Sequence, residues 1–274
     1  MLSEYRRSLQ LRINDFETKG LFNNDVEIDP PAASLQVGDV DYLNKKLSSK
    51  ILTFIANKAA VRFYENKIKN GDMIIKDIKG IENFRSVQGG AIITCNHFNI
   101  CDNYAVYRAI KPELKKGHKL YKVIKEENYF GFKGLFGLLF RHCNTLPLSK
   151  NFDVLREFYH AVSTLLSRGE KILVYPEQSM WWNYKKPRPL KAGAFKFAVN
   201  NNVPIIPVFI TMEDSDKIDA DGSFVQEYTL HFSKPIYPNK NLSPHENVSF
   251  MKDKNFELWK NIYESEYKIP LEYK

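Results

Sequence analysis

The chain has no hydrophobic run long enough to cross a membrane as a helix, which would take about 18–20 consecutive apolar residues. The nearest candidate, 134-GLFGLLF-140, is bounded by Lys133 and Arg141. The first ten residues, MLSEYRRSLQ, also lack the roughly 7–15-residue apolar core of a secretory signal peptide. If the protein works on membranes, the pattern therefore predicts that it lies on them, at the cytoplasmic side, as a peripheral or monotopic protein.

Cysteine is scarce, and the three cysteines are Cys95, Cys101 and Cys143. They show no C-x-x-C spacing, and their odd number leaves one without an intramolecular partner. These features indicate reduced thiols in an intracellular protein, and they offer no metal-binding pattern. The sequence also lacks a helix-turn-helix or zinc-finger signature, so nucleic acid is a poor explanation of its charge.

Positive charge is in excess, with 40 Lys and Arg against 32 Asp and Glu, a net charge of +8 and a pI near 9.1. This balance favours an anionic partner, either a phosphorylated substrate or an anionic membrane surface, although a generally basic soluble protein is the alternative. With 43% hydrophobic and 26% charged residues, the composition is that of a globular protein. A chain of 274 residues is long enough to bury a sizeable core.

Two regions of different pattern divide the chain. Residues 1–70 read mostly as helix, broken by a turn around Asp29–Pro31, whereas residues 71–274 alternate short apolar runs with helical periods. The predicted strands cover 73–78, 91–95, 119–124, 171–175, 204–210 and 228–233, and the predicted helices cover 103–111, 126–140, 153–168, 191–201 and 247–268. This alternation predicts an α/β domain with a mixed, largely parallel sheet covered by helices, preceded by an N-terminal helical segment.

One predicted helix, 43–62, is a candidate for membrane contact. Its apolar stripe consists of Leu43, Leu47, Ile51, Phe54 and Ile55, and its flanks carry Lys45, Lys46 and Lys50. A basic amphipathic helix suits an anchor on an anionic membrane, with its long basic side chains reaching the headgroups. A helix packed on the domain with a solvated basic face is an equally good interpretation of the same pattern.

The most informative stretch is 91-AIITCNHFNICD-102, an apolar strand that ends on Asn96 and His97. On one helix, His97 and Asp102 would point about 140° apart, because they are five residues apart. A strand that ends at His97, followed by a helix whose first turn holds Asp102, brings the two side chains together. Another predicted strand ends at 176-PEQS-179, and α/β folds bind ligands at such strand ends. A structural hydrogen bond is the alternative to a catalytic pair.

Four ordered blocks resemble the glycerolipid acyltransferases that carry an Asn-His-x4-Asp motif, a family that includes 1-acylglycerol-3-phosphate acyltransferases. The motif itself is 96-NHFNICD-102, and the family's Pro-Glu-Gly-Thr block is similar to 176-PEQS-179. A Lys-x-Gly-Ala block is found at 191-KAGA-194, and a Val-Pro-x-x-Pro-Val strand at 203-VPIIPV-208. Ahead of them, 80-GIENF-84 resembles the family's Gly-x-Glu-Asn, so the resemblance extends over residues 73–210.

The resemblance implies an acyltransferase that needs no cofactor beyond its co-substrate, an acyl-CoA or acyl carrier protein thioester. It implies that His97 acts as general base, oriented by Asp102, and removes a proton from a hydroxyl of a lysophospholipid-like acceptor. That hydroxyl attacks the thioester directly, so Cys101 is expected to be a packed residue and not a nucleophile. Together with the basic loop that follows the Pro-Glu-Gly-Thr-like block, it indicates as substrate-binding residues Asn96, Lys150, Glu177, Gln178, Ser179, Lys185, Lys186 and Arg188.

The sequence departs from the family pattern where an acceptor phosphate would be held. Met180 stands where related enzymes often have an arginine, and Lys150 aligns with a second family arginine. Because lysine lacks the guanidinium fork, bidentate phosphate recognition is weakened at Lys150. Gln178 replaces a glycine and adds bulk where the acceptor is expected.

The loop 180-MWWNYKKPRPL-190 offers a replacement for the lost arginines, because Lys185, Lys186 and Arg188 are basic. Its Trp181 and Trp182 suit a membrane interface or an acyl-chain wall, and buried packing is an equally good interpretation.

Two alternatives stand beside a lysophospholipid-like acceptor. One keeps the chemistry and changes the acceptor to a glycolipid or another non-phosphatidate lipid. The other is a catalytically silent lipid-binding module with the same fold. The intact His97 and Asp102 argue against the silent module, because a decayed site would be free to lose either residue.

Overall fold

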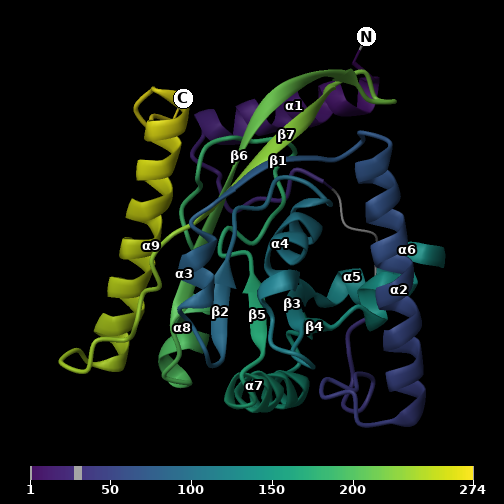
Figure 1. Ribbon diagram of the computed structural model, residues 1–274, viewed down its shortest axis with the longest axis vertical. Coiled ribbons are helices and arrows are strands. Elements are labelled where there is room, and N and C mark those ends of the chain that lie inside the picture. Colours follow the sequence, from purple (N-terminus) through teal and green to yellow (C-terminus); the bar gives the residue numbers. More distant parts are fainter. Residues whose placement is uncertain (1, 28–32, 274) are drawn as a thin grey trace.

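The computed structural model describes residues 2–27 and 33–273, and its centre is a seven-stranded sheet (Figure 1). The strands lie in the order β1-β7-β6-β2-β5-β3-β4. Their bounds are β1 Ile74–Lys79, β2 Ala91–Thr94, β3 Leu120–Lys125, β4 Thr145–Leu148, β5 Lys171–Val174, β6 Ile205–Ile218 and β7 Phe224–Phe232. Strands β6 and β7 pair antiparallel, and each of the other neighbouring pairs is parallel. The predicted α/β class with a mixed, largely parallel sheet is confirmed.

Helices cover both faces of the sheet, because its central strands are apolar on both sides. In β2, Ile92 lies in one core cluster with residues of α7 (Phe152–Ser167) and α8 (Gly193–Asn200). The next residue, Ile93, lies in the opposite cluster with residues of α3 (Ile81–Arg85) and α4 (Asp102–Ile110). A strand buried on both faces reads as a nearly continuous apolar run, as 91-AII-93 does before Thr94.

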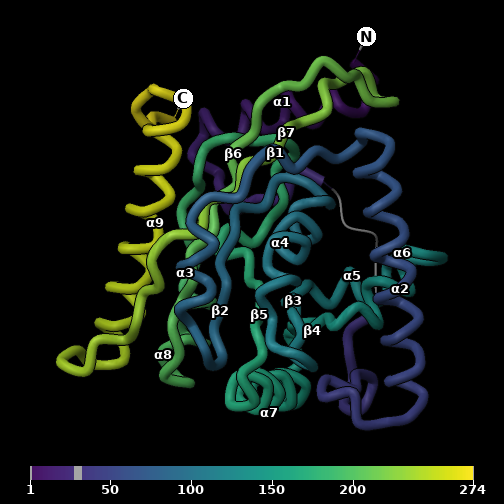
Figure 2. The backbone as a smooth tube through the Cα atoms, viewed as in Figure 1, coloured from purple at the N-terminus to yellow at the C-terminus, as the bar shows by residue number. Residues whose placement is uncertain are grey.

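Two long helices flank the sheet on opposite sides, α9 (Pro244–Tyr267) on one and α2 (Leu47–Lys69) on the other (Figure 2). Helix α2 buries Ala56, Ala60 and Tyr64 against the domain. Helix α1 (Glu4–Thr18) crosses the end of the molecule near the last turns of α9. Its Leu9 and Ile13 pack in a third core cluster with Trp181 and Trp182.

The predicted helix over 126–140 is two helices, α5 (Glu126–Gly131) and α6 (Gly134–His142). Phe132 is extended between them, and Gly134 takes a φ of 58°, a left-handed conformation that glycine adopts without steric cost and that interrupts a helix. Strand β4 was not predicted, because it is a short edge strand that contains Pro147 and depends on pairing with β3. The strand predicted over 204–210 continues to Ile218, where its outer half pairs with β7. A 3₁₀ turn, Lys111–Glu113, follows α4.

The N-terminal region is less helical than predicted, since residues 19–27 and 33–46 form turns and irregular segments between α1 and α2. The predicted turn at Asp29–Pro31 lies outside the described residues. Leu43 precedes the start of α2, so the apolar stripe on this helix begins at Leu47. Within the described ranges, no helix is both long enough and apolar enough to cross a membrane.

The block 80-GIENF-84 directly follows β1 and forms α3. Gly80 has a φ of 74°, and a Cβ on it would lie 2.3 Å from the Phe232 carbonyl oxygen, so no other residue fits there. Asn83 Nδ2 donates to the same carbonyl oxygen at 2.8 Å. The block thus ties α3 to the end of β7.

Candidate active site

The histidine loop, residues 95–102, begins where β2 ends. The amide of buried Asn96 extends the pairing of β2 with β6, since its Nδ2 donates to Ile210 O at 3.0 Å and its Oδ1 accepts from Ile210 N at 2.8 Å. Both ends of this predicted substrate-binding side chain are therefore engaged by the backbone. They hold the chain in place at the point where His97 leaves the sheet.

Asp102 is the first residue of α4, and its side chain is fully buried. Its Oδ2 accepts hydrogen bonds from His97 Nδ1 at 2.8 Å, from Phe98 N at 3.1 Å and from Asn99 N at 3.2 Å. Its Oδ1 accepts one from the Tyr175 hydroxyl at 2.6 Å. The five-residue spacing thus allows the loop to fold around one carboxylate, which receives four donors.

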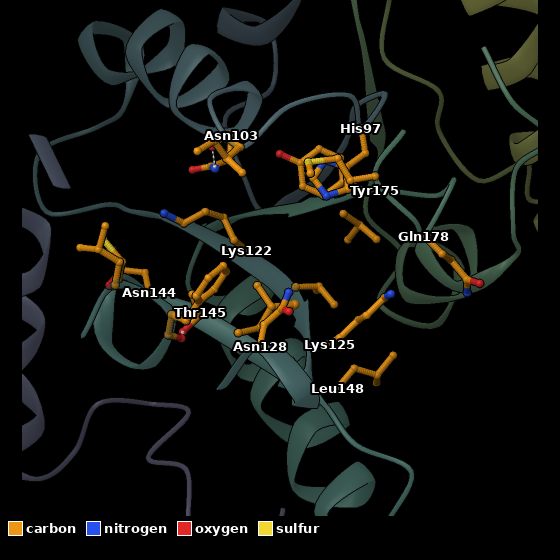
Figure 3. Close-up of a pocket in the computed structure, with 18 of the residues that line it drawn as sticks. His97, Asn103, Lys122, Lys125, Asn128, Asn144, Thr145, Leu148, Tyr175 and Gln178 are labelled. Atoms are coloured by element: carbon orange, nitrogen blue, oxygen red, sulfur yellow. Dashed lines mark hydrogen bonds between the residues drawn. The ribbon is translucent and has the colours of Figure 1, made fainter. Parts of the chain in front are cut away.

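The partners of Asp102 determine the tautomer of His97. A carboxylate only accepts, so Nδ1 must carry the proton, and Nε2 keeps the lone pair that can take a proton from a substrate. The His97 side chain is 23% exposed and lines a cavity of about 780 Å³ (Figure 3). The structure therefore brings the predicted pair together at the wall of a cavity.

Tyr175 completes this arrangement, although the sequence motif does not include it. Its ring stacks on the His97 ring, with centroids 4.0 Å apart and an angle of 18° between planes. It directly follows β5, whose Val174 is in register with Thr94 of the parallel strand β2, so Tyr175 and the histidine loop leave the sheet side by side. The sequence feature that could have identified Tyr175 as a site residue is its position at a strand end, immediately before 176-PEQS-179.

Glu177 and Arg188 form a buried ion pair behind the histidine loop, with Arg188 Nη2 donating to Glu177 Oε2 at 3.0 Å. Glu177 Oε2 also accepts from His97 N at 3.0 Å, and Arg188 Nη1 donates to Ser179 Oγ at 2.8 Å and to Phe22 O at 3.2 Å. These three predicted substrate-binding residues are at most 3% exposed. Through Glu177, this buried group holds the backbone amide of His97 in place.

The other predicted binding residues are scattered. Lys186 pairs with Glu17 of α1 at 2.5 Å, and Lys185 lies 3.9 Å from Asp214 on the surface. Lys150 and Gln178 do line the cavity. The structure therefore places Lys150 and Gln178 in the lining of the cavity that His97 also lines, and it directs Lys185 and Lys186 to carboxylates elsewhere.

Gln178 occupies the place of the family's glycine and keeps a glycine-like backbone. Its φ is 66°, a left-handed conformation that costs an L-residue roughly 1–2 kcal/mol. The side chain is exposed at the cavity, and Figure 3 shows it pointing away from His97. The extra bulk thus lies beside the site and does not cover the imidazole.

Trp181 and Trp182 are both buried, so of the two interpretations packing is correct and a membrane interface is wrong. Trp181 stacks on Phe22, with ring centroids 5.8 Å apart, and its Nε1 donates to Asn24 O at 3.0 Å. The Arg6 guanidinium lies 4.5 Å from the Trp182 ring centroid. The loop after 176-PEQS-179 is therefore anchored by the N-terminal segment.

The cavity has an apolar part and a charged part, and the charged part contains carboxylates, among them Asp25 paired with Lys125 at 2.7 Å, as well as lysines. Helices α2 and α6 supply an apolar wall that includes Ala60, Val61, Phe136, Leu139 and Phe140. Strand β3 supplies Lys122 and Lys125, which the motif comparison did not single out although Lys122 interrupts an apolar strand. In Figure 3 Lys122 extends on the side of Asn103 and Asn144, and Lys125 on the side of Gln178.

The buried thiols near the site are poor nucleophiles. Burial raises the pKa of Cys101 to about 12 and raises the pKa of Cys95 well above its usual value. A nucleophilic cysteine needs the thiolate, which these environments disfavour at neutral pH. Cys101 is a packed residue of the core beneath α4.

Arg188→Met should destabilise the protein by about 3–5 kcal/mol, because it leaves the Glu177 carboxylate buried without its partner. Urea unfolding measures the change. Lys185→Met, which removes an exposed cation from the same loop, should stay within about 0.5 kcal/mol of wild type. Equal stability of the two variants would contradict the bracing role of Arg188.

Comparison with known proteins places this geometry in a family. A family model described as "Acyltransferase" matches residues 76–211, a segment that includes the histidine loop, Tyr175 and the Glu177–Arg188 pair. Among solved structures, the chain is similar to the 1-acyl-sn-glycerophosphate (LPA) acyltransferase PlsC from Thermotoga maritima, at 17% identity over 93% of this chain and 97% of that chain, with a TM-score of 0.48. A search of curated proteins gave no match. The match over this segment shows that the chain belongs to the acyltransferase family.

Proposed function

We propose that the protein moves a fatty acyl group from an acyl-CoA or acyl carrier protein thioester to a hydroxyl of a lysophospholipid-like acceptor of the 1-acylglycerol-3-phosphate type. His97 is the general base, and Asp102 orients it. The observation that carries the proposal is the 2.8 Å hydrogen bond between His97 Nδ1 and Asp102 Oδ2 at the wall of the cavity. Membership of the acyltransferase family supports the reaction type.

The reaction follows from the tautomer of His97. Its Nε2 removes the proton from the acceptor hydroxyl as the oxygen attacks the thioester carbonyl carbon. Asp102 stabilises the imidazolium that forms, because its carboxylate already accepts the Nδ1 proton. When the tetrahedral intermediate collapses, the C–S bond breaks and the imidazolium returns its proton to the thiolate. The products are the acylated acceptor and the free thiol of the carrier.

His97→Ala should lower acyl transfer by roughly 10²–10⁴-fold, since it removes the base. Asp102→Asn should also be severe, because it removes the charge that stabilises the imidazolium. The assay supplies a lipid extract with labelled acyl thioesters and identifies which lipid becomes labelled. His160→Ala, at an exposed position on α7, and Cys101→Ala should keep most of the activity.

Two outcomes of that assay would contradict parts of the proposal. A labelled acyl group trapped on a serine or cysteine would replace direct transfer by a covalent mechanism. Absence of transfer to every lipid by a folded wild-type protein that still binds lipid would favour the silent lipid-binding module.

The cavity cations support an anionic acceptor. Lys122 and Lys150 line the cavity, and the Lys150 contact with Glu127, at 3.3 Å, is exposed to solvent. For Lys122, no carboxylate among residues 2–27 and 33–273 lies within ion-pair distance. An ammonium at the wall of a partly apolar cavity is stabilised by an anion such as a phosphate.

Lys122→Met and Lys150→Met should each raise the acceptor KM by roughly 10-fold or more, because a charge-assisted hydrogen bond contributes about 1.5–3 kcal/mol. The donor KM should change far less. Removing the phosphate from the acceptor should erase the difference from wild type, and Lys185→Met serves as the matched control. If both cavity variants handle phosphorylated acceptors normally, the glycolipid acceptor is favoured instead.

An apolar surface near the cavity supports contact with a membrane. The N-terminal half of α2 exposes Leu47, Ile51, Phe54 and Ile55, and Phe54 is 60% exposed. On α6, Phe136 is 37% exposed and also lines the cavity. The exposed Lys45, Lys46 and Lys50 flank the stripe and suit an anionic leaflet, where each contributes about 1 kcal/mol.

Replacing Ile51, Phe54 and Ile55 by Ser should reduce pelleting with anionic vesicles, since the apolar contribution is lost. Binding of wild type should be partly salt-sensitive, because high ionic strength screens only the lysine contribution. Replacing Ile218, Phe224 and Tyr237 by Ser removes exposed apolar side chains from another surface and should leave pelleting unchanged. Equal pelleting of wild type and the α2 variant would show that another surface makes the contact.

A further inference from the structure

Tyr175 contacts both members of the His97–Asp102 pair. Its ring covers the imidazole at 4.0 Å, and its hydroxyl donates to Asp102 Oδ1 at 2.6 Å. One side chain therefore fixes the plane of the imidazole and engages the carboxylate oxygen that His97 does not use.

The Tyr175 hydroxyl binds the Asp102 oxygen to which the histidine loop does not donate. Among the hydrogen bonds of the described residues, Tyr175 is the sole donor to Asp102 Oδ1, while three donors share Oδ2. A separation of 2.6 Å is typical of a charge-assisted O–H···O⁻ bond, which is about twice as strong as a neutral one. The bond draws negative charge toward Oδ1, so less of it is available to stabilise an imidazolium at His97.

We propose that Tyr175 is a positioning residue whose hydroxyl, by engaging Asp102, keeps His97 in the neutral, proton-accepting form down to a lower pH than Asp102 alone would allow. This inference rests on the proposed role of His97 as base. Its consequence is that the enzyme keeps activity further toward acid than it would with phenylalanine at this position.

The surrounding titratable groups do not compete for this role. Cys95, Cys101, Tyr64 and Tyr228 pack around the site, and burial raises the pKa of each of them. Burial and then the Asp102 carboxylate raise the pKa of Tyr175 itself, so its hydroxyl stays protonated as a donor. Glu177 is paired with Arg188, and Lys122 lies on the cavity wall. Among the described residues, none of these other groups hydrogen-bonds to Asp102 Oδ1, the oxygen that Tyr175 engages.

Tyr175→Phe keeps the ring and removes the hydroxyl. The acid limb of the pH–kcat profile should move to higher pH by roughly 0.5–1 unit, while kcat at the optimum stays within a few-fold of wild type. Tyr159→Phe, on the exposed face of α7, should leave the profile unchanged. Lower activity at every pH, with the limb in its original place, would indicate a merely structural role and overturn the proposal.

An NMR titration of the His97 ring without substrate tests the same claim independently of turnover. Its midpoint should move to higher pH in Tyr175→Phe. A fluorinated tyrosine at position 175 donates more strongly and should move the midpoint to lower pH, which keeps the test open if the phenylalanine variant folds poorly. An unshifted midpoint in an active enzyme overturns the role of Tyr175. Absence of acyl transfer by wild type counts against the proposed function instead, so the two failures are distinguishable.

Discussion

A carboxylate removed from water must have its oxygens occupied by hydrogen-bond donors, and Asp102 imposes this requirement on the whole site. Its four donors come from the loop after β2 and from Tyr175 at the end of β5. Satisfying them bends the chain between His97 and Asp102 and holds the imidazole at the cavity wall. The geometry that suits proton transfer is therefore the same geometry that makes the buried charge tolerable.

A second buried charge extends this requirement to distant parts of the chain. Glu177 accepts from the backbone of His97, and Arg188 reaches from Glu177 to the carbonyl oxygen of Phe22. A buried ion pair is stable only when both partners and their remaining hydrogen bonds are in place. The strand ends, the loop after 176-PEQS-179 and the N-terminal segment thus depend on one another, although the motif resides in two short stretches.

The cavity combines this polar framework with an apolar wall. Phe63 of α2 and Phe136 of α6 meet edge to face, with centroids 5.8 Å apart, and Phe136 belongs both to the cavity lining and to the exposed surface. Lys122 of β3 and Lys150 line the same cavity. An apolar wall together with these two lysines matches the amphiphilic acceptor that we propose.

The sequence by itself determined the parts of the protein that depend on local pattern. Apolar runs and helical periods predicted the α/β class and six of the strands, because the core-facing periodicity is local in the chain. The spacing of His97 and Asp102 at a strand end predicted their contact, since only the folded loop brings residues five apart together. Strand β4 escaped prediction because its pairing with β3 is a tertiary contact.

Only the tertiary structure decided which polar side chains face the cavity. Arg188 was expected to bind a phosphate, but its guanidinium donates to the Glu177 carboxylate and to the Phe22 carbonyl oxygen and is buried. No local sequence pattern reveals a partner as distant in sequence as Phe22. Lys122 looked like an ordinary strand residue, yet the packing of α2 and α6 places it in the lining of the cavity that His97 also lines. The hydroxyl of Tyr175 acquires its partner only because parallel strands β2 and β5 end side by side. Local sequence determines where a side chain leaves the backbone, and long-range packing determines what that side chain meets.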